Sequence, residues 1–444
     1  IHMIEPSPHH PATVYVAATR YKLDDYRPLL YKTDDFGRTW EKITNGISSD
    51  DFTRVIRVDP INPGLLYAGT ETGVYVSFND GFSWNSLQIN LPVVPIYDME
   101  VKNNDLILAT HGRSFWVLEG LNLLRQLDCV GTDFRPTLFK PASTYRMLRS
   151  PGLVQSVGEG KNYSADIFGL GGTYCLNTAS DGDADRVFLD AGTNPTYGVV
   201  INYFLTENFC STVSLRFLDA DRKLVSRFPD PVSGSRAPTT RAGLNRFVWD
   251  MRFPDAELGE TKRNQRVGKG GIPGIAPLVT PGRYRVELVI GDQIYAKSFE
   301  LLQDPRTAAT KEDFEAQLNL LLSIRERLTD ARRALNQITK IEDKILEAKG
   351  SEGLDEYLPV IPNSKEDALL ELRQLRLKIS GVGKPNQTSE WNPSGIAEML
   401  EALFPVVSSS DSRPTRQSYE VFKVLSDRLD EHLRLVGSVI QPSL

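Results

Sequence analysis

The side chains of this 444-residue chain that could carry acid–base chemistry are carboxylates near its beginning: Asp24, Asp25, Asp98, Glu100 and Asp105. Hydrolysis of a glycosidic bond uses two carboxyl groups about 5–10 Å apart, one of which donates a proton. These five residues are candidates by type, but their spacing along the chain places no two of them in one cleft. The catalytic residues are therefore left unassigned, and whether the chain is an enzyme stays open, with a non-enzymatic role favoured.

Other catalytic and metal-binding patterns are absent from the sequence. The five histidines form no HExxH motif, and the sequence has neither a GxSxG elbow nor a glycine-rich phosphate loop. Asp181–Asp185 begins like a calcium loop, but Arg186 stands where an EF-hand needs glycine and Gly192 where it needs glutamate. We interpret this stretch as a polar loop and expect neither a metal nor a cofactor.

The three cysteines, Cys129, Cys175 and Cys210, form no CxxC pair, which argues against a zinc ribbon or a thioredoxin-type site. Cys175 and Cys210 lie in strand-like segments of one region. Two separate buried thiols are the favoured interpretation, and a Cys175–Cys210 disulfide is the alternative.

The composition is that of a soluble globular protein, with 40% hydrophobic and 24% charged residues. The net charge of −6 argues against a nucleic-acid partner, because such proteins carry a basic face. No apolar run is long enough for a transmembrane helix. Ile1–Pro6 has neither the basic nor the apolar part of a signal peptide, but a mature secreted chain would have lost that segment.

The elements that must position any site contain an internal repeat. The octapeptide Thr33–Trp40 recurs as Ser77–Trp84, and the strand-like segment Pro11–Ala17 that precedes the first copy matches Pro63–Gly69 before the second. Four short antiparallel strands need about 40–50 residues, which is the spacing of these two copies. The sequence therefore predicts two successive four-stranded units.

Each position of the octapeptide has a structural role. Thr33 ends a strand, Asp35 bonds its own turn backbone, and Gly37 supplies a positive φ. Trp40 follows Thr39, opens the next strand and fills the gap between neighbouring sheets. The corresponding residues of the second copy are Ser77, Asn79, Gly81, Ser83 and Trp84. Asp35 is accordingly a folding residue rather than a catalytic one.

The pattern S/T-x-D/N-x-G-x-S/T-W resembles the Asp-box, or bacterial neuraminidase (BNR) repeat, of sialidases, xyloglucanases and sortilin-type propellers. The surroundings, including Thr110–Leu118, look like large bacterial proteins described as sortilin-like or as BNR-repeat glycosyl hydrolases, and the likeness extends into the C-terminal half. The resemblance implies a β-propeller and says little about activity. The arginine triad and tyrosine nucleophile of a sialidase are not assignable here.

Residues 1–120 supply only about two and a half blades, because a partial third unit follows at Leu106–Thr110 and Ser114–Leu118. A closed propeller needs at least four blades, and an open array exposes strand edges and an apolar face. We therefore predict that the remaining blades lie on another polypeptide or in a missing N-terminal part.

After residue 120 the sequence pattern changes from a linker to regular strands, and then to helices. Residues 121–164 are predicted to be a linker, and the regular strands of 165–305 predict a β-sandwich. Gly243–Asp250 and Pro281–Tyr284 are similar to the Ig-like or fibronectin-III-like domain of flagellar hook-capping proteins. Helical periodicity over 309–440 predicts four amphipathic helices in a bundle, with Thr310 capping the first.

Two charged segments are expected to face solvent. Asp255–Val279 is rich in glycine and proline and carries four basic residues, so a solvated loop is favoured over a clamp onto a neighbouring domain or an anionic glycan. Arg325, Arg327, Arg332 and Arg333 are interleaved with acidic residues, which is typical of a solvated helix face.

Together these features predict a mainly β multidomain protein with an α tail. The favoured function is that of a non-catalytic binding and scaffold protein of the sortilin-like type, with a peptide, glycan or protein as its ligand. We expect it to act outside the cytoplasm, in the extracellular space, in the periplasm or at the cell surface. The alternatives are the C-terminal part of a BNR-repeat glycoside hydrolase and a structural subunit of a cell-surface assembly.

Overall fold

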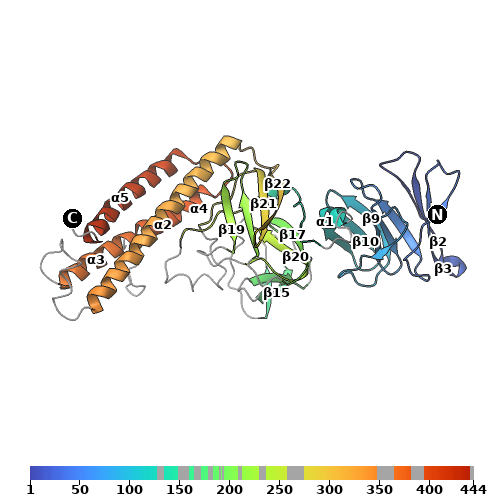
Figure 1. Ribbon diagram of the computed structural model, residues 1–444, viewed down its shortest axis with the longest axis horizontal. Helices are drawn as coiled ribbons and strands as arrows, with labels where there is room; N and C mark the ends of the chain where they lie inside the picture. The colour runs from blue at the N-terminus through green and yellow to red at the C-terminus, as the bar shows by residue number, and fades with distance from the viewer. Residues whose placement is uncertain are drawn as a thin grey trace. The chain divides into compact units, whose positions relative to one another are not determined.

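The chain forms two compact units in the computed structural model (Figure 1), Ile1–Ala142 with Asn202–Thr206, and Ser143–Ile201 with Glu207–Leu444. The structure describes residues 1–127, 135–148, 160–164, 172–178, 184–189, 192, 195–208, 213–229, 237–257, 275–347, 365–381 and 395–440. The first unit is mainly β, and the second combines antiparallel sheets with a helical C-terminal region. Among the described helices, none has the length and apolar character needed to cross a membrane.

The first unit contains three antiparallel sheets whose strands follow one another along the chain. The first sheet comprises β1 (Met3–Pro6), β2 (Val14–Arg20), β3 (Asp25–Thr33) and β4 (Glu41–Lys42), with a 3-10 turn, η1 (Tyr21–Leu23), between β2 and β3. The second sheet comprises β5 (Thr53–Val58), β6 (Leu66–Thr70), β7 (Val74–Ser77) and β8 (Asn85–Ser86). The third sheet has three strands, β9 (Ile96–Lys102), β10 (Asp105–Thr110) and β11 (Phe115–Glu119).

The second sheet lies between the other two, because β5 contacts both β2 and β9. Nearly all residues of β5, β6 and β7 are buried, so both faces of the second sheet are covered and two cores form. The core between the first and second sheets includes Tyr15, Ala17, Leu30, Ile43, Ile56, Leu66, Ala68 and Trp84. The core between the second and third sheets includes Val55, Tyr67, Val74, Ile96, Met99, Leu106 and Leu108.

The stretch expected as a linker over 121–164 contributes to both units where the structure describes it. α1 (Leu121–Leu127) packs Leu121 into the core of the second and third sheets. β12 (Thr137–Leu138) pairs with Phe204 and Tyr203, and β13 (Thr144–Arg146) pairs in parallel with β22 (Gln293–Gln303).

The strands of the second unit form two facing layers. One layer has the order β13, β22, β21 (Gly282–Ile290), β18 (Val213–Leu218) and β19 (Leu224–Phe228). The other includes β20 (Gly243–Trp249) and the Val199–Ile201 part of β17 (Val199–Leu205). Trp249 of β20 is fully buried and stacks on Phe217 of β18 with 4.3 Å between ring centroids, so the layers share one aromatic core. A separate sheet contains β14 (Lys161–Ser164), β15 (Gly172–Thr178) and β16 (Ala184–Phe188).

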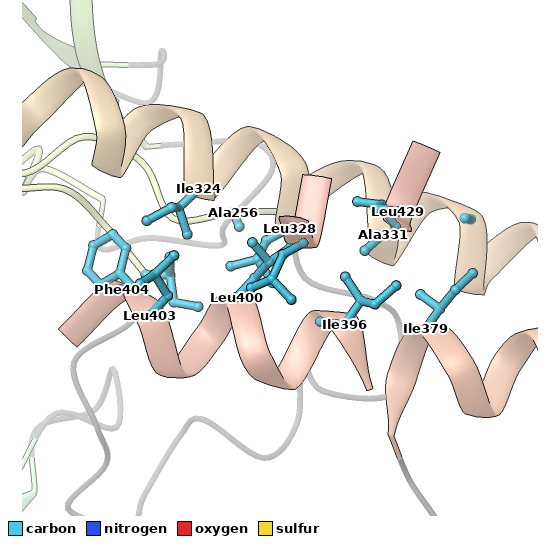
Figure 2. Close-up of a cluster of buried hydrophobic side chains, with 14 of the residues drawn as sticks. Ala256, Ile324, Leu328, Ala331, Ile379, Ile396, Leu400, Leu403, Phe404 and Leu429 are labelled. Carbon is cyan, nitrogen blue, oxygen red and sulfur yellow. The ribbon is translucent and has the colours of Figure 1, made fainter. Parts of the chain in front are cut away.

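Four helices end the chain: α2 (Lys311–Glu347), α3 (Lys365–Ser380), α4 (Ile396–Val407) and α5 (Arg416–Ile440). Figure 2 shows part of their shared core, to which α2 contributes Leu328, α4 contributes Leu400 and α5 contributes Leu429. Thr310 caps α2 as expected, since its Oγ1 accepts the amide of Asp313 at 3.3 Å.

The expectation of a solvated Arg325–Arg333 face was wrong for two of its arginines. Arg332 is buried and donates to the carbonyls of Ala256 and Glu257, each at 3.1 Å, and to Glu401 at 2.7 Å. Arg325 donates to the Pro254 carbonyl at 3.2 Å. The described ends of the Asp255–Val279 loop are correspondingly not solvated, because Ala256 and Ile275 belong to the core of the bundle.

Candidate functional site

The first octapeptide forms the turn between β3 and β4, and its polar side chains bond one another. Asp35 Oδ1 accepts the amides of Arg38 and Thr39 at 2.9 Å each, and Thr39 Oγ1 donates to Asp35 Oδ2 at 2.7 Å. Thr33 Oγ1 donates to Asp35 Oδ1 at 2.8 Å and accepts the Gly37 amide at 3.0 Å. The Asp35 carboxylate is thus engaged entirely in closing its own turn.

The second octapeptide repeats this network between β7 and β8 with an amide in place of the carboxylate. Asn79 Oδ1 accepts the Ser83 amide at 2.9 Å, and Asn79 Nδ2 donates to Ser83 Oγ at 2.9 Å. Ser77 Oγ accepts the Gly81 amide at 2.9 Å. A negative charge is therefore not required at this position, which supports a folding role for Asp35 and Asn79.

At neutral pH, Asp35→Asn is expected to lower the melting temperature slightly, because it removes the charge, and Asp35→Ala to lower it further, by a few degrees, because alanine also removes the oxygen that closes the turn. Hydrogen bonds from Thr39 hold the pKa of Asp35 at about 2. A lowered pKa stabilises the fold above the unfolded pKa of about 3.9, and the contribution is lost as the pH falls through about 2. Thermal scans between pH 5 and pH 2 should show this loss in the wild type and a smaller one in Asp35→Asn; equal pH dependence would contradict the assignment.

Two of the five carboxylates proposed as catalytic candidates are held as charged partners of arginines. Asp25 binds Arg27 at 2.9 Å, and this contact lowers the pKa of Asp25 to about 2. Asp98 binds Arg57 at 2.8 Å. A general acid needs a raised pKa, so Asp25 is unsuited to that role.

For the remaining three candidates, Asp24, Glu100 and Asp105, the described contacts include no ion pair with an arginine. Asp24 ends η1 with φ 60°, and Asp105 accepts the Gly120 amide at 3.3 Å. Glu100 lies two residues after Asp98 in β9, so the two carboxylates share one face of that strand. This is the one pairing that the fold adds to the five candidates.

Sequence reasoning missed a cluster of aromatic side chains at the strand ends opposite the octapeptide turns. β3 begins at this end beside η1 and finishes in the first octapeptide turn. Tyr21 of η1 stacks on Phe52 with 4.9 Å between ring centroids, and Tyr97 of β9 stacks on His111 at the same distance. Tyr26 lies 6.0 Å from Phe52. We call Tyr21, Tyr26, Phe52, Tyr97 and His111 the aromatic platform.

A buried arginine joins the two halves of the platform. The Arg54 guanidinium carbon lies 4.3 Å from the Tyr97 ring centroid, 4.9 Å from Phe52 and 5.5 Å from Tyr21. Arg54 also donates from Nε to Glu71 at 2.7 Å. These cation–π contacts hold the rings of Tyr21, Phe52 and Tyr97 in place, and the ion pair with Glu71 holds Arg54 itself.

The outer rings of the platform remain available to solvent. Tyr26 is 48% exposed and Tyr97 41% exposed, whereas Phe52 and Arg54 are buried. Exposed tyrosines that are held rigidly offer a flat apolar surface with a polar edge, which is suited to binding rather than to proton transfer. The sequence signal was weak, because these residues come from η1, β3, β9, the segment before β5 and the segment after β10, and only the fold brings them together.

The remaining predicted positions carry no chemistry that the structure reveals. No cluster of metal-binding side chains occurs among the described residues. Cys175 is a partly buried free thiol in β15, whereas Cys129 and Cys210 lie outside the described residues, so two separate thiols stay the favoured prediction and the Cys175–Cys210 disulfide the alternative. Most of the calcium-like stretch, 181–183, also lies outside them.

Comparison with known proteins finds distant structural likeness only. No protein-family model matches the chain. No curated protein matches it either. Among solved structures, a GH74 enzyme of Niastella koreensis aligns over 68% of this chain and 46% of its own, with 12% identity and a TM-score of 0.23. PorZ, an essential surface component of the type-IX secretion system of Porphyromonas gingivalis, aligns over 65% and 37%, with 14% identity and a TM-score of 0.20.

A third structure, YCF48 bound to D1 peptide, aligns over 26% of this chain and 36% of its own, with 16% identity and a TM-score of 0.20. The chain thus spans less than half the length of each of these three proteins.

Proposed function

We propose that this chain is a non-catalytic binding and scaffold protein of the Asp-box propeller type that acts outside the cytoplasm. In this proposal the three sheets of the first unit are successive blades and the octapeptide turns are Asp-boxes. The two-layer part of the second unit is an Ig-like or fibronectin-III-like spacer that leads into the helical bundle.

The aromatic platform is the observation that carries the binding role. It combines exposed tyrosine rings with a buried arginine that fixes them, and neither Asp25 nor Asp98 beside it is free of an arginine partner. We commit to a glycan as the ligand class. The C–H face of a pyranose ring covers a flat aromatic ring, while its hydroxyl groups meet the tyrosine edge.

Cellohexaose is a suitable probe because its sugar rings present broad C–H faces. Tyr97→Ala and Tyr26→Ala are each expected to weaken its binding by roughly three- to tenfold in isothermal titration calorimetry, as expected for the loss of one ring contact. Phe82→Ala is the matched control, because Phe82 is 75% exposed at the opposite, octapeptide end of the sheets. Equal affinity in all variants, or binding of a proline-rich peptide in place of the sugar, would reject the glycan proposal.

A glycoside hydrolase is the second candidate, because Asp98 and Glu100 share a face of β9 next to Tyr97 of the platform. On that alternative, Asp98→Asn or Glu100→Gln abolishes the release of reducing sugar. We expect the wild-type chain to bind cellohexaose without cleaving it, so that product analysis by chromatography shows only the intact oligosaccharide.

A further inference from the structure

The interface between the first and second sheets shows how a tryptophan of one sheet, Trp84, is buried against the sheet that precedes it. Trp84 is only 3% exposed, and its indole Nε1 donates to the Ile43 carbonyl at 2.8 Å. Its backbone amide donates to the Asn45 carbonyl at 2.8 Å. A side chain at Gly46, which has φ +98°, would meet the Trp84 carbonyl oxygen at 2.3 Å. The receiving element is therefore Ile43–Gly46, which follows the fourth strand of the first sheet.

At the same position of the first sheet, no described residue receives the tryptophan in this way. Trp40 corresponds to Trp84, but it is 47% exposed and its Nε1 donates to the carbonyl of Gly37 in its own turn at 3.2 Å. Ile4, on the same sheet, is 58% exposed. Both residues are large and apolar. Because they are exposed, this face of the first sheet lacks the stabilisation that burial of Trp84 gives the corresponding face of the second sheet.

The glycines of the two octapeptides differ in the same way. A side chain at Gly81 would meet Ile43 Cδ1 at 2.7 Å, because the first sheet covers that turn. At Gly37 the nearest atom would be Trp40 Cζ2, at 3.8 Å. Gly37 and Gly81 have nearly equal φ angles, +84° and +86°, so the difference lies in the neighbour and not in the turn.

We propose that the face of the first sheet formed by Ile4, Tyr31 and Trp40 docks a further four-stranded sheet of the same repeat that is not contained in residues 1–444. This sheet places an apolar residue and a glycine against Trp40, as Ile43 and Gly46 do against Trp84. The inference rests on the proposed assignment of the sheets as blades, but not on the ligand of the platform.

A second copy of this chain does not supply the receiving element. Its open end is the third sheet, which has three described strands. After β11 the chain enters α1, and Leu121 and Leu124 pack back toward the core of the second and third sheets. The counterpart of Ile43–Gly46, which follows a fourth strand, is therefore not formed there, and the occupant is a sheet with all four strands.

Hydroxyl-radical footprinting of Trp40 and Trp84 tests this inference in two preparations, residues 1–444 alone and the protein isolated from its natural source. In residues 1–444 we expect Trp40 to oxidise at least tenfold faster than Trp84. In the natural preparation the Trp40 rate should fall to that of Trp84, which is the internal control. An unchanged Trp40 rate in the natural preparation overturns the inference, and so does protection of Trp40 in residues 1–444 that grows with concentration.

Trp40→Glu separates this inference from the proposed function. In residues 1–444 the variant is expected to bind cellohexaose with wild-type affinity, because Trp40 lies at the octapeptide end of the strands and the platform at the other. In the natural preparation, the variant is expected to prevent docking of the further sheet. The amides of β1–β3 should then exchange hydrogen as fast as they do in residues 1–444. Unchanged protection of β1–β3 in that variant contradicts the docking role of Trp40.

Discussion

Trp84→Ala is expected to lower the free energy of unfolding of the first unit by about 3–5 kcal/mol, the usual cost of emptying a buried tryptophan site. Trp84 is 3% exposed and its indole N–H reaches the Ile43 carbonyl, so the variant loses both packing and a buried hydrogen bond. The two sheets would separate along the gap that this ring fills.

Trp40→Ala is the matched control, because it makes the same substitution at the same repeat position. Its ring is 47% exposed, so the expected cost is below about 1 kcal/mol. Urea denaturation followed by circular dichroism measures both variants. Equal costs for the two tryptophans would mean that Trp40 is buried in solution, and the account of an uncovered first sheet would be wrong.

Arg146→Ala is expected to destabilise the second unit by about 3–5 kcal/mol, because it leaves a buried carboxylate without its partner. Arg146 Nη1 lies 2.5 Å from Asp411 Oδ1, and both side chains are almost fully buried. Arg146 Nε donates to the Val279 carbonyl at 2.6 Å, and the guanidinium packs over Phe314 of α2 at 4.8 Å. One side chain thus ties β13 and the strand layers to the helical bundle.

Arg283→Ala is the control for this prediction, since Arg283 is an exposed arginine of β21 in the same unit. Its cost is expected to stay within about 0.5 kcal/mol. Replacing Arg146 and Asp411 together by Met and Leu should cost less than Arg146→Ala alone, because no unpaired charge remains buried. If the single variant unfolds at the same urea concentration as the wild type, the pair does not hold the unit together.

The sequence correctly predicted the features whose interactions lie within a short stretch of the chain, namely turns, strand faces and helix faces. The spacing of Thr33, Asp35 and Gly37 predicted the turn, because all its hydrogen bonds form within eight residues. The alternation of Tyr284, Val286 and Leu288 predicted a strand with one buried face, and β21 has it. The helical period of α2 likewise predicted its buried stripe, including Leu321 and Leu328.

Features that depend on contacts between distant segments were not predictable. Trp40 and Trp84 occupy the same position of the repeat, yet among the described residues only Trp84 has a neighbouring sheet to pack against. Arg332 has acidic residues nearby in sequence, but its position is decided by carbonyls of a loop far from it along the chain. The aromatic platform combines residues of five separate segments, and no periodicity in the sequence reveals that these segments lie close together.

A high-resolution structure of the protein isolated from its natural source tests the central claim most directly, because a propeller requires both outer sheets of the first unit to be covered. The prediction is that further four-stranded sheets lie against Trp40 on one side and against Ile107, Phe115 and Val117 of the third sheet on the other. A structure in which both faces meet only solvent, or in which a second copy of residues 1–444 covers them, would contradict it.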